Sequence, residues 1–322
     1  MTRVTPLGGA NEIGASCTLV EVGGLGVLVD AGIRPKLRGS AAYPDFDFIR
    51  QSGVRLGAVL VTHAHVDHTG GLPVLCREFP GVPVFATPPT IRITKALLED
   101  ARSIQENDDF LPPDYTAAEL QTLSRPFVPI RFNKPTLVAY SDEVRITATF
   151  VRAGHILGAA MIVLDIFERS TGEATQLLFS GDISLFDQPT VKGCDVDAVR
   201  QLRPDLCILE GTYGANERGG GVFLEEARFV QSIARVLERG GRVVIPAFAV
   251  GRAQNIVTIL RRAYLDPRPY REALGDPYFS MPRVPIFVDG MCRTVADVYD
   301  AFKLMLHPEL LRERRADTHV FF

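Results

Sequence analysis

The amino-acid sequence predicts an α/β fold in two consecutive domains. The first 190 residues alternate short strand patterns with loops and a few helices, whereas strand and helix patterns alternate regularly after residue 205. A chain of 322 residues exceeds the usual size of a single hydrophobic core, which also favours two domains. We place the boundary in the loop at 190–205 and therefore expect domains at residues 1–204 and 205–322.

The first domain is predicted to be mostly β-structure. Gly23 and Gly24 form the turn of a strand pair, and the strand that begins at Leu56 runs directly into His63. The spacing of apolar residues predicts one helix, and the acidic, proline-bearing segment 107–136 is expected to be loop and short turns. The expected strands are 17–22, 26–30, 56–62, 82–86, 143–152, 160–167 and 176–179, and the helix is 91–105, after a break at Pro88-Pro89.

The second domain is predicted to contain a parallel sheet. Its patterns follow the order β-α-β-α, in which helices cover a sheet of parallel strands. The first of its helices ends at two glycines, as helix C-termini often do. The expected strands are 205–210, 241–247 and 284–288, the helices are 224–239, 253–264 and 294–306, and a flexible loop is expected at 219–221.

Composition excludes several classes of protein. The longest strongly apolar stretches without charge, 156–164 and 243–251, are nine residues long, whereas a membrane-spanning helix needs about twenty. Apolar residues make up 46% of the chain, too many for a disordered protein. The formal net charge is −3, and no basic block resembles a nucleic-acid-binding tail. Five scattered cysteines and the lack of an apolar signal core predict a cytoplasmic protein.

A dense group of metal-ligand side chains follows the strand at 56–62. Residues 63–68 read His-Ala-His-Val-Asp-His, so four ligand-type residues lie within six positions. A loop that leaves a strand end can turn the imidazoles of His63 and His65 toward one point. Asp67 and His68 can then face a second point close by. Neutral imidazole and carboxylate are the ligands expected for zinc or a similar divalent ion.

Three residues elsewhere in the first domain fit the same site. His155 follows Gly154 at a strand-to-loop switch; alone it would be a structural polar residue, but beside the first motif we expect a ligand. Asp182 ends a strand pattern, where a carboxylate can bridge two metal ions. Asp30 also ends a strand, and it is expected to accept a ring N–H from a ligating histidine or, alternatively, to cap a turn.

Taken in chain order, these motifs resemble the metallo-β-lactamase superfamily: D-x-G at Asp30, then H-x-H-x-D-H, a lone G-H, and S-G-D. The resemblance implies a four-layer αββα sandwich with a two-zinc site at one edge of its sheets. By position, it implies that His63, His65 and His155 hold one metal ion, Asp67 and His68 the other, with Asp182 as the bridge and Asp30 as the orienting aspartate.

The sequence after Asp182 narrows the resemblance to the β-CASP ribonucleases of this superfamily. Residues 209–214 stand where those enzymes carry an acidic motif, and residues 245–254 resemble their P-A-F-[AS]-x-G-R-x-Q segment. Other resembling segments are 8–17, 98–106 and 284–291, so the match covers about residues 4–303 in colinear order. Relatives include bacterial and archaeal RNA-processing nucleases and the endonuclease subunit of the eukaryotic pre-mRNA 3′-end processing complex.

The resemblance implies a metal-dependent hydrolase that cleaves phosphodiester bonds of single-stranded RNA, in RNA processing or decay. Its cofactors would be two zinc ions, with manganese as the alternative, and its catalytic residues Asp67, Asp182 and Glu210. Glu210 can orient a metal-bound group or accept a structural hydrogen bond. Arg252, at a strand-to-helix switch, can meet a substrate phosphate or pair with a carboxylate. The sequence leaves endonuclease and exonuclease action both open.

The sequence departs from the family pattern toward its C-terminus. Two further family histidines, regarded as a general acid and a ligand of the second metal, follow the inserted domain. His307 and His319 lie in no matching motif, and Asn255 and Ser103 replace residues that are often Glu and His in relatives. We therefore expect a truncated, incomplete β-CASP domain with a parallel sheet, and weaker occupancy of the second metal site.

Several interpretations fit this departure. The chain can be a fragment, a protein completed by a second chain, or a degenerate member, and a homodimer also fits. The alternative functions are a catalytically weak or inactive RNA-binding or scaffold subunit, and another hydrolase of the metallo-β-lactamase fold.

Overall fold

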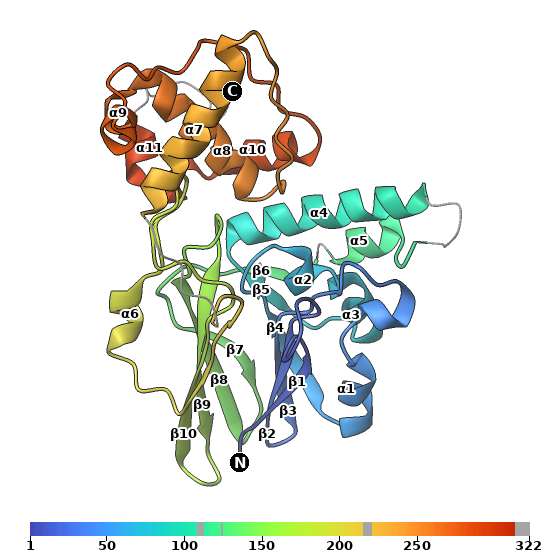
Figure 1. Ribbon diagram of the computed structural model, residues 1–322. Coiled ribbons are helices and arrows are strands. Elements are labelled where there is room, and N and C mark those ends of the chain that lie inside the picture. The colour runs from blue at the N-terminus through green and yellow to red at the C-terminus, as the bar shows by residue number, and fades with distance from the viewer. Residues whose placement is uncertain (108–112, 124, 215–220, 313–322) are drawn as a thin grey trace. The chain divides into compact units, whose positions relative to one another are not determined.

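The computed structural model describes residues 1–107, 113–123, 125–214 and 221–312 (Figure 1). The chain forms two compact units. Unit 1 comprises residues 1–187 and 192–212, and unit 2 comprises the segment 188–191 together with the chain from Tyr213 onward. The strand expected at 205–210 therefore belongs to unit 1, while the assignment of domains to 1–204 and 205–322 stays a prediction.

The first sheet of unit 1 has six strands in sequential order. Its first three strands are antiparallel, and the pairs from the third strand to the sixth are parallel. The strands are β1 (Arg3–Gly8), β2 (Cys17–Val22), β3 (Leu25–Val29), β4 (Arg55–Leu60), β5 (Val84–Ala86) and β6 (Phe127–Pro129).

The second sheet of unit 1 has five strands in the order β11-β10-β9-β8-β7. All its pairs are antiparallel except β10 with β11, which is parallel. The strands are β7 (Thr136–Tyr140), β8 (Val144–Arg152), β9 (Ala160–Glu168), β10 (Glu173–Phe179) and β11 (Leu206–Ile208).

The main core lies between the two sheets. Val27 and Leu60 of the first sheet and Phe150 and Leu164 of the second are fully buried in one apolar cluster. Removing this surface from water is the dominant force that holds the sheets face to face. The loops at the ends of both sheets are therefore carried by a single compact unit.

Helices cover the outer face of the first sheet (Figure 1). A second apolar cluster joins Leu28 and Val59 of this sheet to Phe46, Leu72 and Leu98 of the helices. The helices are α1 (Phe46–Ser52), α2 (Val66–Thr69), α3 (Leu72–Glu78), α4 (Pro88–Glu106) and α5 (Ala117–Leu123), with a short 3-10 turn at Gly39–Ala42.

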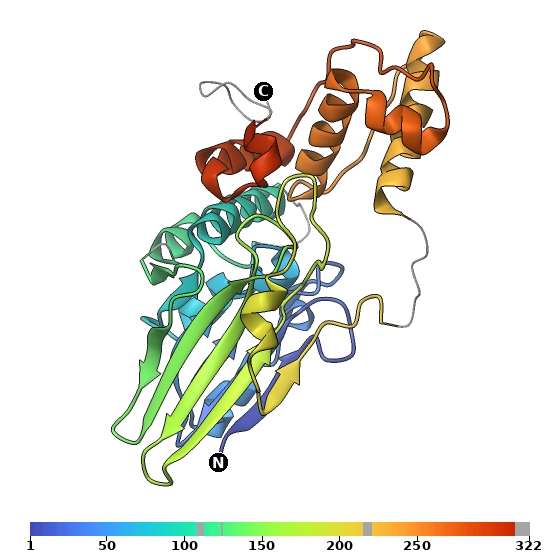
Figure 2. The same ribbon diagram turned by 90° about the vertical axis from the view of Figure 1, so that its left-hand side faces the viewer.

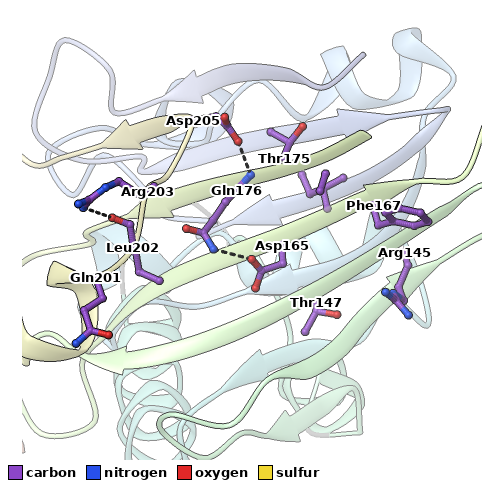
Figure 3. A pocket seen from close by; sticks show the side chains of 12 residues that line it. Arg145, Thr147, Asp165, Phe167, Thr175, Gln176, Gln201, Leu202, Arg203 and Asp205 are labelled. Atoms are coloured by element: carbon purple, nitrogen blue, oxygen red, sulfur yellow. Dashed lines mark hydrogen bonds between the residues drawn. The ribbon is translucent and has the colours of Figure 1, made fainter. Parts of the chain in front are cut away.

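The outer face of the second sheet is largely open, as Figure 2 shows. Within the described part of the chain, only α6 (Val196–Arg200) lies over it, so three of the four expected layers are fully built. A shallow depression of about 570 Å³ occupies this open face between the sheet and residues 201–205. Gln176 donates a hydrogen bond to Asp165 there (Figure 3). The depression contains none of the expected metal ligands.

Unit 2 is helical in the residues that the structure describes. Its core joins Val230 of α7, Leu260 of α8 and Tyr270 of α9. The helices are α7 (Val222–Glu238), α8 (Arg252–Leu265), α9 (Arg268–Leu274), α10 (Met291–Ala301) and α11 (Pro308–Arg312), with a 3-10 turn at Lys303–Met305.

The parallel sheet expected in the second domain is not formed by the described residues. Residues 241–248 and 281–289 belong to no strand. A parallel strand needs neighbours to pair its backbone groups and cover both of its faces. Here Val244 is 88% exposed and Phe287 is 91% exposed, so neither segment has the cover that would stabilise a central strand. The strand predictions at 241–247 and 284–288 are wrong for this structure.

Several predicted boundaries also shift. The helix expected at 91–105 begins at Pro88, because the first turn of a helix tolerates proline, whose missing N–H would have had no partner there. The segment expected to be loop at 107–136 contains α5 and β6. Most of the loop at 219–221, part of the 107–136 segment and His319 lie outside the described residues. No helix in the described part of the chain is long and apolar enough to cross a membrane.

Candidate metal centre

The strand directions of unit 1 gather the expected ligands at one edge of each sheet. In the first sheet β3 and β4 are parallel, so Asp30 and His63, which follow them, lie at the same edge. In the second sheet β8 and β10 are both antiparallel to β9, so His155 and Asp182, which follow them, also share an edge. The face-to-face packing of the sheets brings these two edges together.

Four of the side chains form a close cluster. Nδ1 of His65 lies 3.2 Å from Nε2 of His63 and 3.1 Å from Nε2 of His155. Oδ2 of Asp182 lies 3.7 Å from Nε2 of His63 and 3.6 Å from Nε2 of His155. One ligand atom from each of these four residues lies within 4.8 Å of all the others.

The spacing of these atoms fits a tetrahedral divalent ion. With zinc–nitrogen bonds of about 2.05 Å, tetrahedral ligand atoms stand about 3.3 Å apart. The separations from the Nδ1 atom of His65 are 3.1 and 3.2 Å, and the longest separation to Asp182 is 3.7 Å. Three imidazoles and one carboxylate are also a donor set that zinc accepts. The residues present therefore fit such an ion.

A second group of ligand atoms adjoins the first. Nε2 of His68 lies 3.4 Å from Oδ1 of Asp182 and 3.9 Å from Oδ2 of Asp67. The two oxygens of Asp182 therefore face different groups, Oδ2 the pair His63 and His155, and Oδ1 His68. This is the geometry required of a carboxylate that bridges two cations.

Asp30 is buried behind this second group. Its Oδ2 lies 2.7 Å from Nδ1 of His68, and its Oδ1 accepts a hydrogen bond from the backbone N–H of Thr62 at 2.8 Å. The residue adopts a φ of 62°, a left-handed conformation that non-glycine residues seldom take. The structure thus brings the Asp30 carboxylate to the ring nitrogen of His68 that faces away from the cluster.

The protein environment shifts the pKa values of the cluster in different directions. Burial, together with the three neighbouring imidazoles, lowers the pKa of His63 well below its usual value, so His63 is neutral and its ring can bind a metal. Burial opposes protonation of His68 as well, but the carboxylates of Asp30 and Asp182 raise its pKa well above the usual value. Burial would raise the pKa of Asp182, yet the hydrogen bond from His68 lowers it. Cation binding to His68 must therefore displace a proton.

Two glycines allow the loops to approach this closely. A Cβ atom on Gly32 would overlap the carbonyl oxygen of Asp67. A Cβ atom on Gly181, which has a φ of 52°, would lie 2.7 Å from Cβ of Thr62. Backbone bonds complete the assembly, because Ser16 N–H donates to the carbonyl of Asp67 at 2.9 Å.

Glu210 is not one of the four clustered residues, and Arg252 belongs to unit 2. Oε1 of Glu210 accepts a hydrogen bond from the backbone N–H of Ile183 at 2.8 Å, so its carboxylate contacts the loop that carries Asp182. Arg252 is the first residue of α8 in unit 2, and its side chain is exposed. Among the described residues, no carboxylate forms an ion pair with it. The roles of Glu210 and Arg252 in a reaction stay predictions.

None of the described residues noted as departures from the family pattern is one of the clustered ligand residues. His307 is buried in unit 2, where its Nδ1 accepts the backbone N–H of Glu309 at 3.2 Å and so caps the start of α11. Asn255 is buried in the same unit and accepts a hydrogen bond from the Thr190 hydroxyl at 2.7 Å. Ser103 lies within α4.

The sequence interpretation missed Thr62. Its hydroxyl group donates to Oδ2 of Asp30 at 2.8 Å and lies 3.1 Å from Nδ1 of His63. The only signal in the sequence was a hydroxyl residue placed directly between a buried strand and the first histidine of the motif.

The chain is similar to several known proteins. A family model described as the metallo-beta-lactamase superfamily matches residues 10–160. The chain is 33% identical over 263 residues to Integrator complex subunit 11 of Danio rerio, a match that covers 80% of this chain and 42% of that protein. It is 32% identical over 321 residues to Transcription termination factor FttA of Methanocaldococcus jannaschii, covering 96% of this chain and 45% of that protein.

A third relative extends the comparison. The chain is 32% identical over 302 residues to Probable RNase MJ4 of Methanocaldococcus jannaschii, which covers 93% of this chain and 62% of that protein. The chain thus spans less than two thirds of the length of these three relatives. The family-model match includes residues 63–68 and His155. Residues 10–160 therefore form a domain of the metallo-beta-lactamase superfamily, and the chain resembles the β-CASP proteins of that superfamily.

Proposed function

We propose that this protein is a divalent-metal-dependent ribonuclease that hydrolyses phosphodiester bonds of single-stranded RNA in RNA processing or decay. The observation that carries the proposal is the cluster of His63, His65, His155 and Asp182, whose ligand atoms lie within 4.8 Å of one another. The similarity to a relative named Probable RNase MJ4 supports RNA as the substrate.

The proposed ligands divide between two ions. His63, His65 and His155 would hold the first ion, Asp67 and His68 would hold the second, and Asp182 would bind both through its separate oxygens. Two divalent cations in such a site supply an ionised water nucleophile near neutral pH and neutralise the charge that develops on a phosphodiester. The donor set favours zinc, and manganese is the alternative.

The chain's own residues would prepare this site. Asp30 holds the ring of His68 so that Nε2 points toward Asp182. Glu210 is proposed to act through the loop that carries Asp182, because its carboxylate holds the N–H of Ile183. Arg252 is proposed to contact a substrate phosphate, which its exposed guanidinium can bind through two hydrogen bonds.

A non-catalytic RNA-binding or scaffold subunit is the second candidate. The observation that favours it is the smaller donor set of the second group, where Asp67 lies 3.9 Å from His68 and the described residues offer few other ligands. Weak occupancy of that site would leave the chain able to bind RNA but slow to cleave it.

Cleavage of a 5′-labelled single-stranded RNA with added Zn²⁺ or Mn²⁺ tests the proposal. Cleavage should disappear with a chelator and with Asp67→Ala, while Asp142→Ala, which alters an exposed turn, should cleave normally. RNA that binds without being cleaved would support the scaffold function. Turnover of a thioester or a chromogenic lactam, with RNA untouched, would instead indicate another hydrolase of the same fold.

A homodimer or a second chain that completes the fold is also proposed, because residues 241–248 and 281–289 expose apolar side chains. Light scattering that finds a stable, well-folded monomer would count against both partners. A cytoplasmic location is proposed because the five cysteines form no disulfide.

A further inference from the structure

Thr62 contacts residues of the candidate metal centre but is not one of the proposed ligands. It directly precedes His63 and is 1% exposed. Its carbonyl oxygen accepts the backbone N–H of Ala160 at 2.8 Å, which ties the end of β4 to the start of β9. Its position is therefore fixed by backbone bonds to both sheets.

The hydroxyl group of Thr62 lies between a carboxylate and an imidazole. Oγ1 is 2.8 Å from Oδ2 of Asp30 and 3.1 Å from Nδ1 of His63. A hydroxyl group has one proton to donate and can accept in return. Because an ionised carboxylate only accepts, the proton of Thr62 must point to Asp30. The Thr62 oxygen is then left to accept from His63.

This direction of hydrogen bonding determines the tautomer of His63. A neutral imidazole carries one N–H, and the other nitrogen offers a lone pair. If Nδ1 of His63 donates to Thr62, the lone pair lies on Nε2, the atom that faces His65 and Asp182. If the hydroxyl pointed the other way, Nε2 would carry the proton and could not bind a cation.

We propose that Thr62 is a positioning residue through which Asp30 orients a second histidine. Asp30 holds His68 directly, through the 2.7 Å contact with Nδ1, and holds His63 through the Thr62 hydroxyl. One buried carboxylate thereby presents Nε2 atoms from both ligand groups to the site. The inference rests on the metal site of the proposed function, and it adds a residue that contacts no ion itself.

The packing around Thr62 suggests a substitution that preserves its shape. Gly181 leaves the space that the Thr62 side chain fills, since a Cβ there would lie 2.7 Å from Cβ of Thr62. Thr62→Val keeps this volume and removes only the hydroxyl group, whereas Thr62→Ser keeps the hydroxyl and removes the methyl group. The pair separates hydrogen bonding from packing.

Metal affinity of the purified full chain is the measurement, by competition with a chromophoric chelator for Zn²⁺. Thr62→Val should bind the ion about 10–100-fold more weakly than the wild type, as is typical when a residue that orients a ligand is lost. Thr62→Ser should restore affinity close to the wild-type value. Thr94→Val is the matched control, because Thr94 is equally buried and its hydroxyl has no hydrogen-bond partner among the described residues.

The outcomes separate this inference from the proposed function. A wild type that binds no divalent ion would contradict the metal site itself. A wild type that binds zinc, with Thr62→Val unchanged or with Thr62→Ser as weak as Thr62→Val, would overturn the role of the hydroxyl group alone. Nitrogen-15 NMR of the metal-free wild type gives a test that needs no variant. It should show a proton on Nδ1 of His63, and an unprotonated Nδ1 would overturn the inference.

Discussion

Asp182 connects the two groups of proposed ligands through the two oxygens of one side chain. Oδ2 faces His63 and His155 at 3.7 and 3.6 Å, and Oδ1 faces His68 at 3.4 Å. An amide in its place would keep one oxygen but present an NH₂ group, a donor that repels a cation, to the other group. The proposed bridging position therefore requires a carboxylate.

Asp182→Asn should accordingly reduce bound zinc below the wild-type content and slow RNA cleavage by at least about 100-fold, equivalent to about 2.7 kcal/mol of transition-state stabilisation. Elemental analysis and single-turnover cleavage measure the two effects. Asp142→Asn, in an exposed turn, is the control and should match the wild type in both. Full metal content in Asp182→Asn would contradict a bridging role.

The stability of the metal-free protein should carry the signature of His68. Its pKa is raised in the folded state, so the folded protein holds this proton more tightly than the unfolded chain, whose value is about 6.5. The resulting stabilisation is fully present below about pH 6.5 and is lost as the pH rises through the folded value. Thermal melts in the presence of a chelator give the melting temperatures of the wild type and of His68→Gln. The difference between them should become smaller as the pH rises above about 6.5. A constant difference would contradict the raised pKa.

The sequence alone could predict the donor atoms but not what orients them. His63, His65 and Asp67 lie within one short motif, and ligand chemistry predicts them as ligands without a structure. Thr62 could not be found in this way, because a threonine at a strand end has many possible roles. Only the distances of 2.8 and 3.1 Å to Asp30 and His63 distinguish it.

At the scale of the elements, the approach of two loops depends on one glycine. The loop after β3 passes so close to α2 that a Cβ atom on Gly32 would overlap the carbonyl oxygen of Asp67. Backbone atoms cannot move aside as the end of a flexible side chain can. The residue type at position 32 therefore limits how α2, which carries Asp67, can lie against the loop after β3.

Gly32→Ala should displace that loop and weaken zinc binding, which isothermal titration would measure as a loss of affinity of at least about tenfold. Gly221→Ala is the matched control, because a Cβ atom there meets nothing within 4 Å and the φ of −73° suits alanine. Wild-type affinity in Gly32→Ala would show that the loop can adjust.

The packing between the sheets should dominate the stability of unit 1. Phe150 of β8 is fully buried between them, so Phe150→Ala should lower the free energy of unfolding by about 3–5 kcal/mol. Tyr140→Ala, at a position 68% exposed in β7, should change it by less than about 0.5 kcal/mol. Urea unfolding followed by circular dichroism is suitable because the chain has no tryptophan. Equal effects of the two substitutions would contradict a core between the sheets.

Local sequence patterns predicted the strands of unit 1 better than those of unit 2. The strand expected at 17–22 has the same bounds in the structure. The strand expected at 143–152 begins one residue later, at Val144. These strands have paired neighbours and buried faces in the structure. Residues 241–248 carry an equally apolar pattern but form no strand, because strand formation depends on neighbours that a local pattern does not specify.

At the scale of the whole molecule, the proposed ligands and their orienting residues all belong to unit 1, which contains residues 1–187. A ligand that binds only the folded state stabilises it by RT ln(1 + [L]/Kd), about 2.7 kcal/mol at a hundredfold excess over Kd. Metal should therefore stabilise unit 1 directly. It should stabilise unit 2 only to the extent that the two units unfold together.

Calorimetry with and without chelator should show this difference. Removal of the metal should lower the transition of unit 1, identified as the one that Phe150→Ala also lowers, and leave a separate transition of unit 2 in place. A chelator that lowered only the transition unaffected by Phe150→Ala would contradict the location of the metal site.

The separation of the ligands along the chain has a consequence for biosynthesis. Asp182 leaves the ribosome more than a hundred residues after His68, and it reaches the site only when β10 has paired with β9. A nascent chain that has exposed the histidine motif alone offers a flexible, incomplete chelate to whichever ion is abundant. Selection of the correct ion must therefore follow assembly of the second sheet, so errors in metal supply would act on folded unit 1 rather than on the emerging histidine motif.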